Sequence, residues 1–186
     1  MKLKRIVITG GPATGKTAII DDLNVRGYTC YEEVIRKLTA DAQNKGEITE
    51  PRSNPIALVN DPELFNTTLI NLRIKDFEAA AATNKSLAFY DRGVPDVLAY
   101  MAYFNQSISK DFEAICNNHS YDHVFILPPW KAIFKDDAER FETFEQATAI
   151  YHHLEHTYQN FGYKPIEVPF GSIKERTNFI IEQLNL

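Results

Sequence analysis

The chain has 186 residues, of which 44% are hydrophobic and 24% charged, as is typical of one globular domain with a sizeable core. Its net charge of −5 argues against general nucleic-acid binding, which needs a basic face. The two distant cysteines, Cys30 and Cys116, suit neither a disulfide framework nor a zinc site and favour a cytoplasmic setting, and the longest uncharged run, 97–109, is too short to span a membrane.

Short apolar runs rich in β-branched residues alternate with longer segments of helical character along the whole chain. In chain order, strands are expected at 5–9, 28–31, 86–90, 122–127 and 164–168. Helices are expected at 16–25, 33–42, 62–83 and 94–104. Three more are expected after them: a short helix that begins near 109, a long helix that ends near 160, and a terminal helix that begins at the capping box 172–175. This alternation predicts one α/β domain spanning 1–186, a three-layer sandwich with a five-stranded parallel sheet.

The most specific motif is a complete G-x-x-x-x-G-K-[ST] phosphate loop between the first strand and the first helix. It consists of Gly10, Gly11, Pro12, Ala13, Thr14, Gly15, Lys16 and Thr17, and Ala18 follows in the helix. Glycines let backbone N–H groups approach phosphate oxygens, and a helix N-terminus favours the same anion. Lys16 is expected to contact the β- and γ-phosphates, and the Thr17 hydroxyl to bind Mg²⁺. A chance match arises in ~1 chain of this length in 200, so the motif predicts a nucleotide-binding site at residues 10–18.

A second candidate position is Asp91-Arg92-Gly93, directly after the third predicted strand. Residues at the carboxyl ends of parallel strands face the ligand crevice, so Asp91 is placed to hold Mg²⁺ opposite Thr17, directly or through water. Arg92 is a candidate phosphate contact on the donor or on the acceptor. The alternative is a plain turn with an exposed ion pair.

Glu33 and Arg36 follow the second predicted strand and therefore lie at the same edge of the sheet. A kinase that phosphorylates a hydroxyl needs a carboxylate to orient that hydroxyl and accept its proton. Glu33 is the candidate base, and Arg36, one helical turn later, is a candidate anion clamp. An equally good interpretation is a helix N-terminus that carries acidic residues for electrostatic reasons.

Two further segments are candidates for covering the site. The segment 130–143, between the fourth strand and the long helix, is a candidate lid, with Arg140 stabilising charge on the transferred phosphoryl group. The alternative is a solvated helix with Asp136 and Arg140 paired at i,i+4. The region 43–83 is expected to form the acceptor pocket and its cover, and the loop around Gly171 and Ser172 is expected to border the base.

Several of these motifs together resemble a known family. They are the run 5–17, Glu33-x-x-Arg36, Tyr90-Asp-Arg-Gly93 with Asp96 and Tyr100, Val124-Phe-Ile-Leu-Pro-Pro-Trp130, Asp137-x-x-Arg140, and Val168-Pro169 with Ile173 and Arg176. Along nearly its whole length the chain resembles the P-loop family, with an AAA-type ATPase or kinase-like domain, that includes two better-known proteins. These are the ribosylnicotinamide kinase domain of the bacterial NAD-biosynthesis regulator and the insect GTP-binding protein of TRP-channel translocation.

The resemblance implies a fold of the nucleoside- or nucleotide-kinase type, with strand order 2-3-1-4-5, that binds ATP or GTP with Mg²⁺. It implies that four residues lie on the nucleotide side, namely Lys16, Thr17, Asp91 and Arg140. It places three residues near the acceptor, namely Glu33, Arg36 and Arg92.

The first functional hypothesis is a small-molecule kinase that transfers the γ-phosphoryl group of ATP to a nucleoside-like hydroxyl. The alternative is a nucleotide-binding switch, an ATPase or GTPase that acts through a protein or lipid partner. A third and weaker one is a structural relative that binds nucleotide without turnover. No Asn-Lys-x-Asp guanine-reading motif occurs, which favours ATP over GTP. The sequence identifies neither the acceptor nor the oligomeric state.

Overall fold

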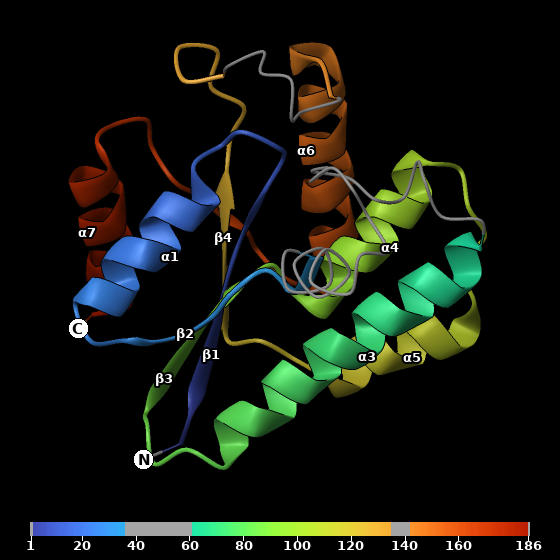
Figure 1. Ribbon diagram of the computed structural model, residues 1–186, viewed down its shortest axis with the longest axis horizontal. Helices are drawn as coiled ribbons and strands as arrows, with labels where there is room; N and C mark the ends of the chain where they lie inside the picture. The colour runs from blue at the N-terminus through green and yellow to red at the C-terminus, as the bar shows by residue number, and fades with distance from the viewer. Residues whose placement is uncertain (1, 36–60, 135–141, 186) are drawn as a thin grey trace, which may run out of the picture.

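A computed structural model describes residues 2–35, 61–134 and 142–185 (Figure 1). These residues contain one five-stranded sheet. The strands are β1 (Lys4–Gly10), β2 (Thr29–Tyr31), β3 (Leu87–Asp91), β4 (His123–Leu127) and β5 (Ile166–Glu167). Their order across the sheet is β2-β3-β1-β4-β5, and every pair of neighbours is parallel. The predicted α/β class and strand order are thereby confirmed.

Helices cover both faces of this sheet, as expected for parallel strands. They are α1 (Lys16–Val25), α3 (Pro62–Ala81), α4 (Val94–Tyr103), α5 (Lys110–Asn118), α6 (Phe144–Asn160) and α7 (Ile173–Gln183). In Figure 1, α1 and α7 lie on one side of the strands and α3 to α6 on the other. None of the helices in the described part of the chain is long and apolar enough to cross a membrane.

The central strand β1 shows why the sequence folds into three layers. Ile6 and Ile8 point to one face, where they belong to the buried cluster formed with α1 and α7. Val7 points to the opposite face and packs with Tyr121 and Tyr158. Side chains alternate along a strand, so an uninterrupted apolar run buries both faces of the sheet at once.

The structure shortens one predicted element. The strand expected at 164–168 contains only Ile166 and Glu167, because Pro165 and Pro169 flank them and lack the N–H group that a longer ladder requires. Val168 still donates its N–H to the carbonyl of Ile126. The described residues leave out 36–60 and 135–141, and with them Arg36 and Arg140. Most of the helix predicted at 33–42, the part of the region 43–83 before residue 61 and half of the segment 130–143 therefore lie outside them.

The register of the sheet places the functional segments next to one another. Ile8 of β1 is opposite Asp91 of β3, and Gly10 is opposite Leu127 of β4. The loop after β1 and the turn after β3 therefore leave the sheet at the same edge. That edge is where parallel α/β sheets bind ligands.

Candidate functional site

The loop between β1 and α1 has a backbone conformation that its glycines make possible. Gly10 and Gly15 have φ values of 148° and 88°. A Cβ at Gly10 would lie 2.7 Å from the carbonyl oxygen of Leu127, and one at Gly15 would lie 2.8 Å from Nη1 of Arg176. Ala13 also has a left-handed φ of 59°, a strained conformation typical of functional loops. The loop is therefore shaped by close approaches that larger residues would prevent.

The N-terminus of α1 differs from that of every other helix in the described part of the chain. Its N-cap residue, Gly15, provides no side-chain cap, and its first turn contains no acidic residue. The other five described helices each have an acidic residue in the first turn, namely Glu63, Asp96, Asp111, Glu145 and Glu175. An anion at the N-terminus of α1 would therefore meet no acidic side chain of that turn, and the helix dipole would favour it.

The Lys16 side chain folds back over the loop. Its Nζ donates hydrogen bonds to the carbonyl oxygens of Gly10 at 3.0 Å and Gly11 at 2.8 Å, and the residue is only 7% exposed. Burial lowers the pKa of Lys16 to about 8, with the nearby Arg92 cation as the second cause, although three neighbouring carboxylates act in the opposite direction. The amine is therefore held against the backbone of the loop itself.

An aromatic pair flanks the loop on the side of α7. The rings of Trp130 and Phe170 are stacked, with 5.0 Å between their centroids. The guanidinium of the buried Arg176 lies 5.8 Å from the Trp130 ring, and its Nη2 donates to the carbonyl oxygen of Thr14 at 2.9 Å. Trp130 is the only tryptophan in the chain, so we expect its fluorescence to report on ligands that bind at this edge.

We expect the affinity for ATP·Mg²⁺ to fall as the pH rises through about 8, where Lys16 loses its proton. A bound phosphate favours the charged amine, so the loss approaches about tenfold per pH unit. Folding stability changes in the opposite sense. Between about 8 and the ordinary 10.5 the unfolded chain holds the extra proton, so the free energy of unfolding rises with pH.

Titration of Trp130 fluorescence with ATP·Mg²⁺ between about pH 7 and 9.5 measures this dependence of affinity. The Lys16→Met variant serves as the control, because its residual binding lacks the titrating amine. A wild-type affinity that stays constant across this range would contradict the assignment of Lys16.

Beside the loop, one acidic and two basic side chains form a buried cluster. Oε1 of Glu33 lies 2.7 Å from Nε of Arg92 and 3.8 Å from Nη2 of Arg73. The Arg92 side chain also donates from Nη1 to the carbonyl oxygen of Gly10 at 3.2 Å. Burial by itself would lower the pKa of Arg92, but the neighbouring acidic groups, Glu33 first, raise it well above its usual value. The Glu33 carboxylate is therefore tied to a permanent cation that contacts the phosphate loop.

The residues predicted to hold Mg²⁺ fit that ion. Thr17 is in the first turn of α1, and Asp91 ends β3, which is hydrogen-bonded to the strand that leads into the loop. A hydroxyl and a carboxylate are hard oxygen donors, and Mg²⁺ is commonly held by one or two such groups together with waters and substrate phosphates. The described residues contain no cluster of three or more His, Cys, Asp or Glu that would suit a metal bound by protein side chains alone.

The structure thus brings together most residues that the sequence singled out. Lys16, Glu33, Asp91 and Arg92 lie at one edge of the sheet with the loop 10–18. Arg73 joins them without having been predicted. It lies on the buried stripe of α3 with Leu69 and Ile70, and a basic residue at a core-facing helical position is the signal that could have identified it.

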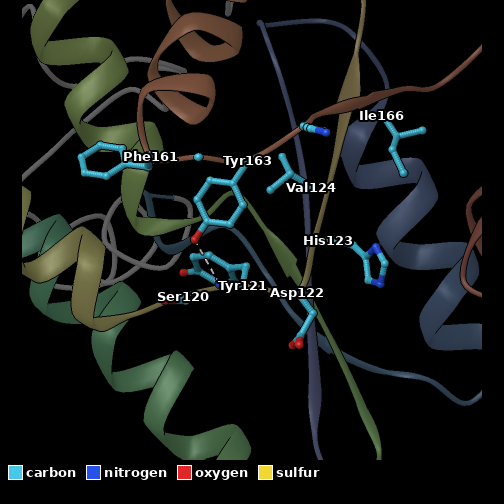
Figure 2. A pocket seen from close by; sticks show the side chains of 10 residues that line it. Ser120, Tyr121, Asp122, His123, Val124, Phe161, Tyr163 and Ile166 are labelled. Atoms are coloured by element: carbon cyan, nitrogen blue, oxygen red, sulfur yellow. Dashed lines mark hydrogen bonds between the residues drawn. The ribbon is translucent and has the colours of Figure 1, made fainter.

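A separate groove of about 440 Å³ opens at the other end of the sheet (Figure 2). It lies beside the start of β4 and the turn before β5, and its lining includes Asp122, His123, Tyr163 and Lys164. Figure 2 shows Tyr163 over Tyr121, whose backbone N–H donates to the Tyr163 hydroxyl at 3.1 Å. The groove contains none of the predicted site residues.

Comparison with known proteins gives a family and a fold. The family model described as the AAA domain matches residues 5–176. No curated protein matches the sequence. Among solved structures, the chain is similar to the deoxyadenosine kinase from M. mycoides with bound dATP, at 16% identity and a TM-score of 0.59, over 98% of this chain and 100% of that one.

Two further solved structures are similar in the same way. The thymidylate kinase from Ehrlichia chaffeensis shares 14% identity at a TM-score of 0.62, over 99% of this chain and 100% of that one. The NadR protein in complex with NR shares 15% identity at a TM-score of 0.68, over 98% of this chain but only 50% of that one. These likenesses establish a P-loop fold, whereas the resemblance to the insect GTP-binding protein stays a prediction.

Proposed function

Because the chain belongs to the AAA domain family, we propose that it is a small-molecule kinase that uses this P-loop site. It transfers the γ-phosphoryl group of ATP to a hydroxyl of a nucleoside-like acceptor, and Mg²⁺ accompanies the nucleotide. The observation that carries the proposal is the Glu33 carboxylate, 2.7 Å from an Arg92 side chain that itself contacts the phosphate loop. A carboxylate in that place suits transfer to a hydroxyl, since nucleotide binding alone does not require a base.

The transfer step divides among the residues of this edge. The acceptor oxygen attacks the γ-phosphorus, the bond from phosphorus to the bridging oxygen breaks, and ADP leaves with that oxygen. Glu33 takes the proton of the acceptor hydroxyl. Lys16 and Arg92 provide positive charge beside the transferred group, and positioning with charge neutralisation supplies most of the catalysis. Thr17 and Asp91 would hold Mg²⁺, which neutralises phosphate charge when bound.

The base of the nucleotide has a suitable surface next to the loop. Trp130 and Phe170 offer aromatic faces, and Phe170 is 55% exposed. Arg176 connects this surface to the loop through its hydrogen bond to Thr14. An adenine ring that stacks here would leave its phosphates directed toward Lys16. In this proposal the neighbouring loop around Gly171 would border the base.

The test is ADP release from ATP·Mg²⁺, measured with and without a panel of nucleosides that includes nicotinamide riboside. We expect one nucleoside-like compound to accelerate release and to appear as a phosphorylated product by mass spectrometry. Slow ADP release that no acceptor accelerates, together with tight nucleotide binding, would contradict the kinase proposal and favour the nucleotide switch.

A further inference from the structure

We propose that Asp96 is a positioning residue, which fixes the Arg92 guanidinium between the phosphate loop and Glu33. Asp96 lies behind Arg92 and acts on the reaction through it. The kinetic part of this inference rests on the proposed kinase function, whereas the geometric part does not.

The Asp96 carboxylate is almost completely buried, with 1% exposure, and both of its oxygens have partners. Oδ1 accepts hydrogen bonds from the Thr9 hydroxyl at 2.5 Å and from Nη1 of Arg92 at 3.3 Å. Oδ2 accepts from the backbone N–H of Gly93 at 2.9 Å and from the Tyr158 hydroxyl at 2.5 Å. The donors come from β1, from the turn after β3 and from α6, so the carboxylate is immobilised from three directions.

The absence of a side chain at Gly93 allows Tyr158 of α6 to reach Asp96. A Cβ at this position would lie 2.6 Å from the Tyr158 hydroxyl and 3.0 Å from a methyl carbon of Val7. Without a side chain at Gly93, Tyr158 reaches past the turn to Asp96. The turn is therefore built to accommodate the partner that holds Asp96 in place.

Arg92 needs such support because of its own conformation. Its φ is 73°, in the left-handed region that non-glycine residues avoid, and its backbone N–H donates to the carbonyl oxygen of Ile8. The guanidinium lies over the Tyr100 ring, with Nε toward Glu33 and Nη1 toward Asp96 and the Gly10 carbonyl. Holding a long side chain in one orientation before substrate arrives lowers the entropic cost of the reaction.

The two carboxylates that contact Arg92, those of Glu33 and Asp96, differ in their exposure and in their roles. The Glu33 side chain is 12% exposed, whereas the Asp96 side chain is 1% exposed and lies out of reach of an acceptor. When Glu33 takes the acceptor proton, it loses its negative charge and its interaction with Arg92 weakens. Asp96 keeps its charge and its contact, so Arg92 stays beside the transferred group during the step.

The experiment compares Asp96→Asn with the wild type by two readouts. The first is the side-chain Nε–H signal of Arg92 in ¹⁵N-arginine NMR spectra, assigned by its loss in Arg92→Lys. We expect Asp96→Asn to speed solvent exchange of this proton at least about tenfold. The second is ADP release from ATP·Mg²⁺, where we expect kcat to fall about 10–100-fold, as for other partners that orient a site residue, and KM for ATP to change less than about threefold.

Tyr163→Phe is the matched control, since it removes a tyrosine hydroxyl that accepts from the backbone N–H of Tyr121, beside Tyr158, and not one that donates to Asp96. We expect it to lower the unfolding temperature while the Arg92 signal and kcat stay within about threefold of the wild type. If Asp96→Asn leaves the Arg92 signal unchanged, or if Tyr163→Phe alters it equally, the proposal is wrong.

Two further variants keep the test decisive. If Asp96→Asn does not fold, Asp96→Glu retains the buried charge but displaces it, and the same change in the Arg92 signal is expected. In an Arg92→Met background, Asp96→Asn should cost no further kcat, and a full additional loss would contradict action through Arg92. The NMR measurement requires no turnover, so it tests whether Asp96 positions Arg92 even if the kinase proposal fails.

Discussion

Lys16→Met is expected to weaken ATP·Mg²⁺ binding by about 100-fold or more, the largest effect on affinity that we predict for this chain. The substitution keeps the buried stem but removes the amine that now donates to Gly10 and Gly11 and would turn to the phosphates. Hydrogen bonds to charged groups contribute about 1.5–3 kcal/mol each, and two phosphates are within its expected reach. Trp130 fluorescence and calorimetric titration with ATP·Mg²⁺ measure the change.

The matched control for this variant is Lys85→Met, which removes an exposed lysine before β3. We expect it to bind nucleotide like the wild type. Lys16→Met should still fold, because it removes a buried charge whose desolvation already lowers the Lys16 pKa. A folded Lys16→Met protein that binds ATP·Mg²⁺ as tightly as the wild type would refute the phosphate-loop assignment.

Glu33→Gln is expected to reduce phosphorylation of the acceptor by about 10²–10⁴-fold, while the affinity for ATP·Mg²⁺ changes by less than about threefold. The amide keeps the size of the carboxylate but cannot take the proton of the acceptor hydroxyl. The variant also loses the 2.7 Å ion pair between residue 33 and Arg92, whereas the ion pair between Arg92 and Asp96 stays in place. Single-turnover phosphoryl transfer, measured with the acceptor from the nucleoside panel, separates the chemical step from binding.

Glu32→Gln provides the control for Glu33, since Glu32 is the adjacent residue and is exposed. Both substitutions remove one negative charge from the same turn, so a general electrostatic effect would appear in both. We expect only Glu33→Gln to lose transfer. If the Glu33 variant transfers the phosphoryl group within about threefold of the wild-type rate, Glu33 is not the base.

The parts of the protein that depend on neighbouring residues were predictable from the sequence. The phosphate loop, the helix 16–25 that follows it and the capping box at 172–175 are local patterns, and the structure confirms them. All five strands were predictable from their short apolar, β-branched runs, and the three central strands, β1, β3 and β4, are mostly buried, as expected inside a parallel sheet. The predicted strand at 164–168 was longer than β5, because the two nearby prolines, Pro165 and Pro169, lack the N–H groups that a longer ladder requires.

By itself, then, the sequence determined the fold class and the place of the phosphate-loop motif between β1 and α1, because both follow from local spacing and from the burial of apolar runs. Only the tertiary structure decided which charges meet. Arg73, Arg92 and Glu33 come from three separate segments, and the sheet order brings them to one edge. The hydrogen-bond partners of Asp96 are set in the same way, since Thr9 and Tyr158 donate to it from β1 and α6. Side-chain pairing across segments depends on how elements pack, which no local pattern encodes.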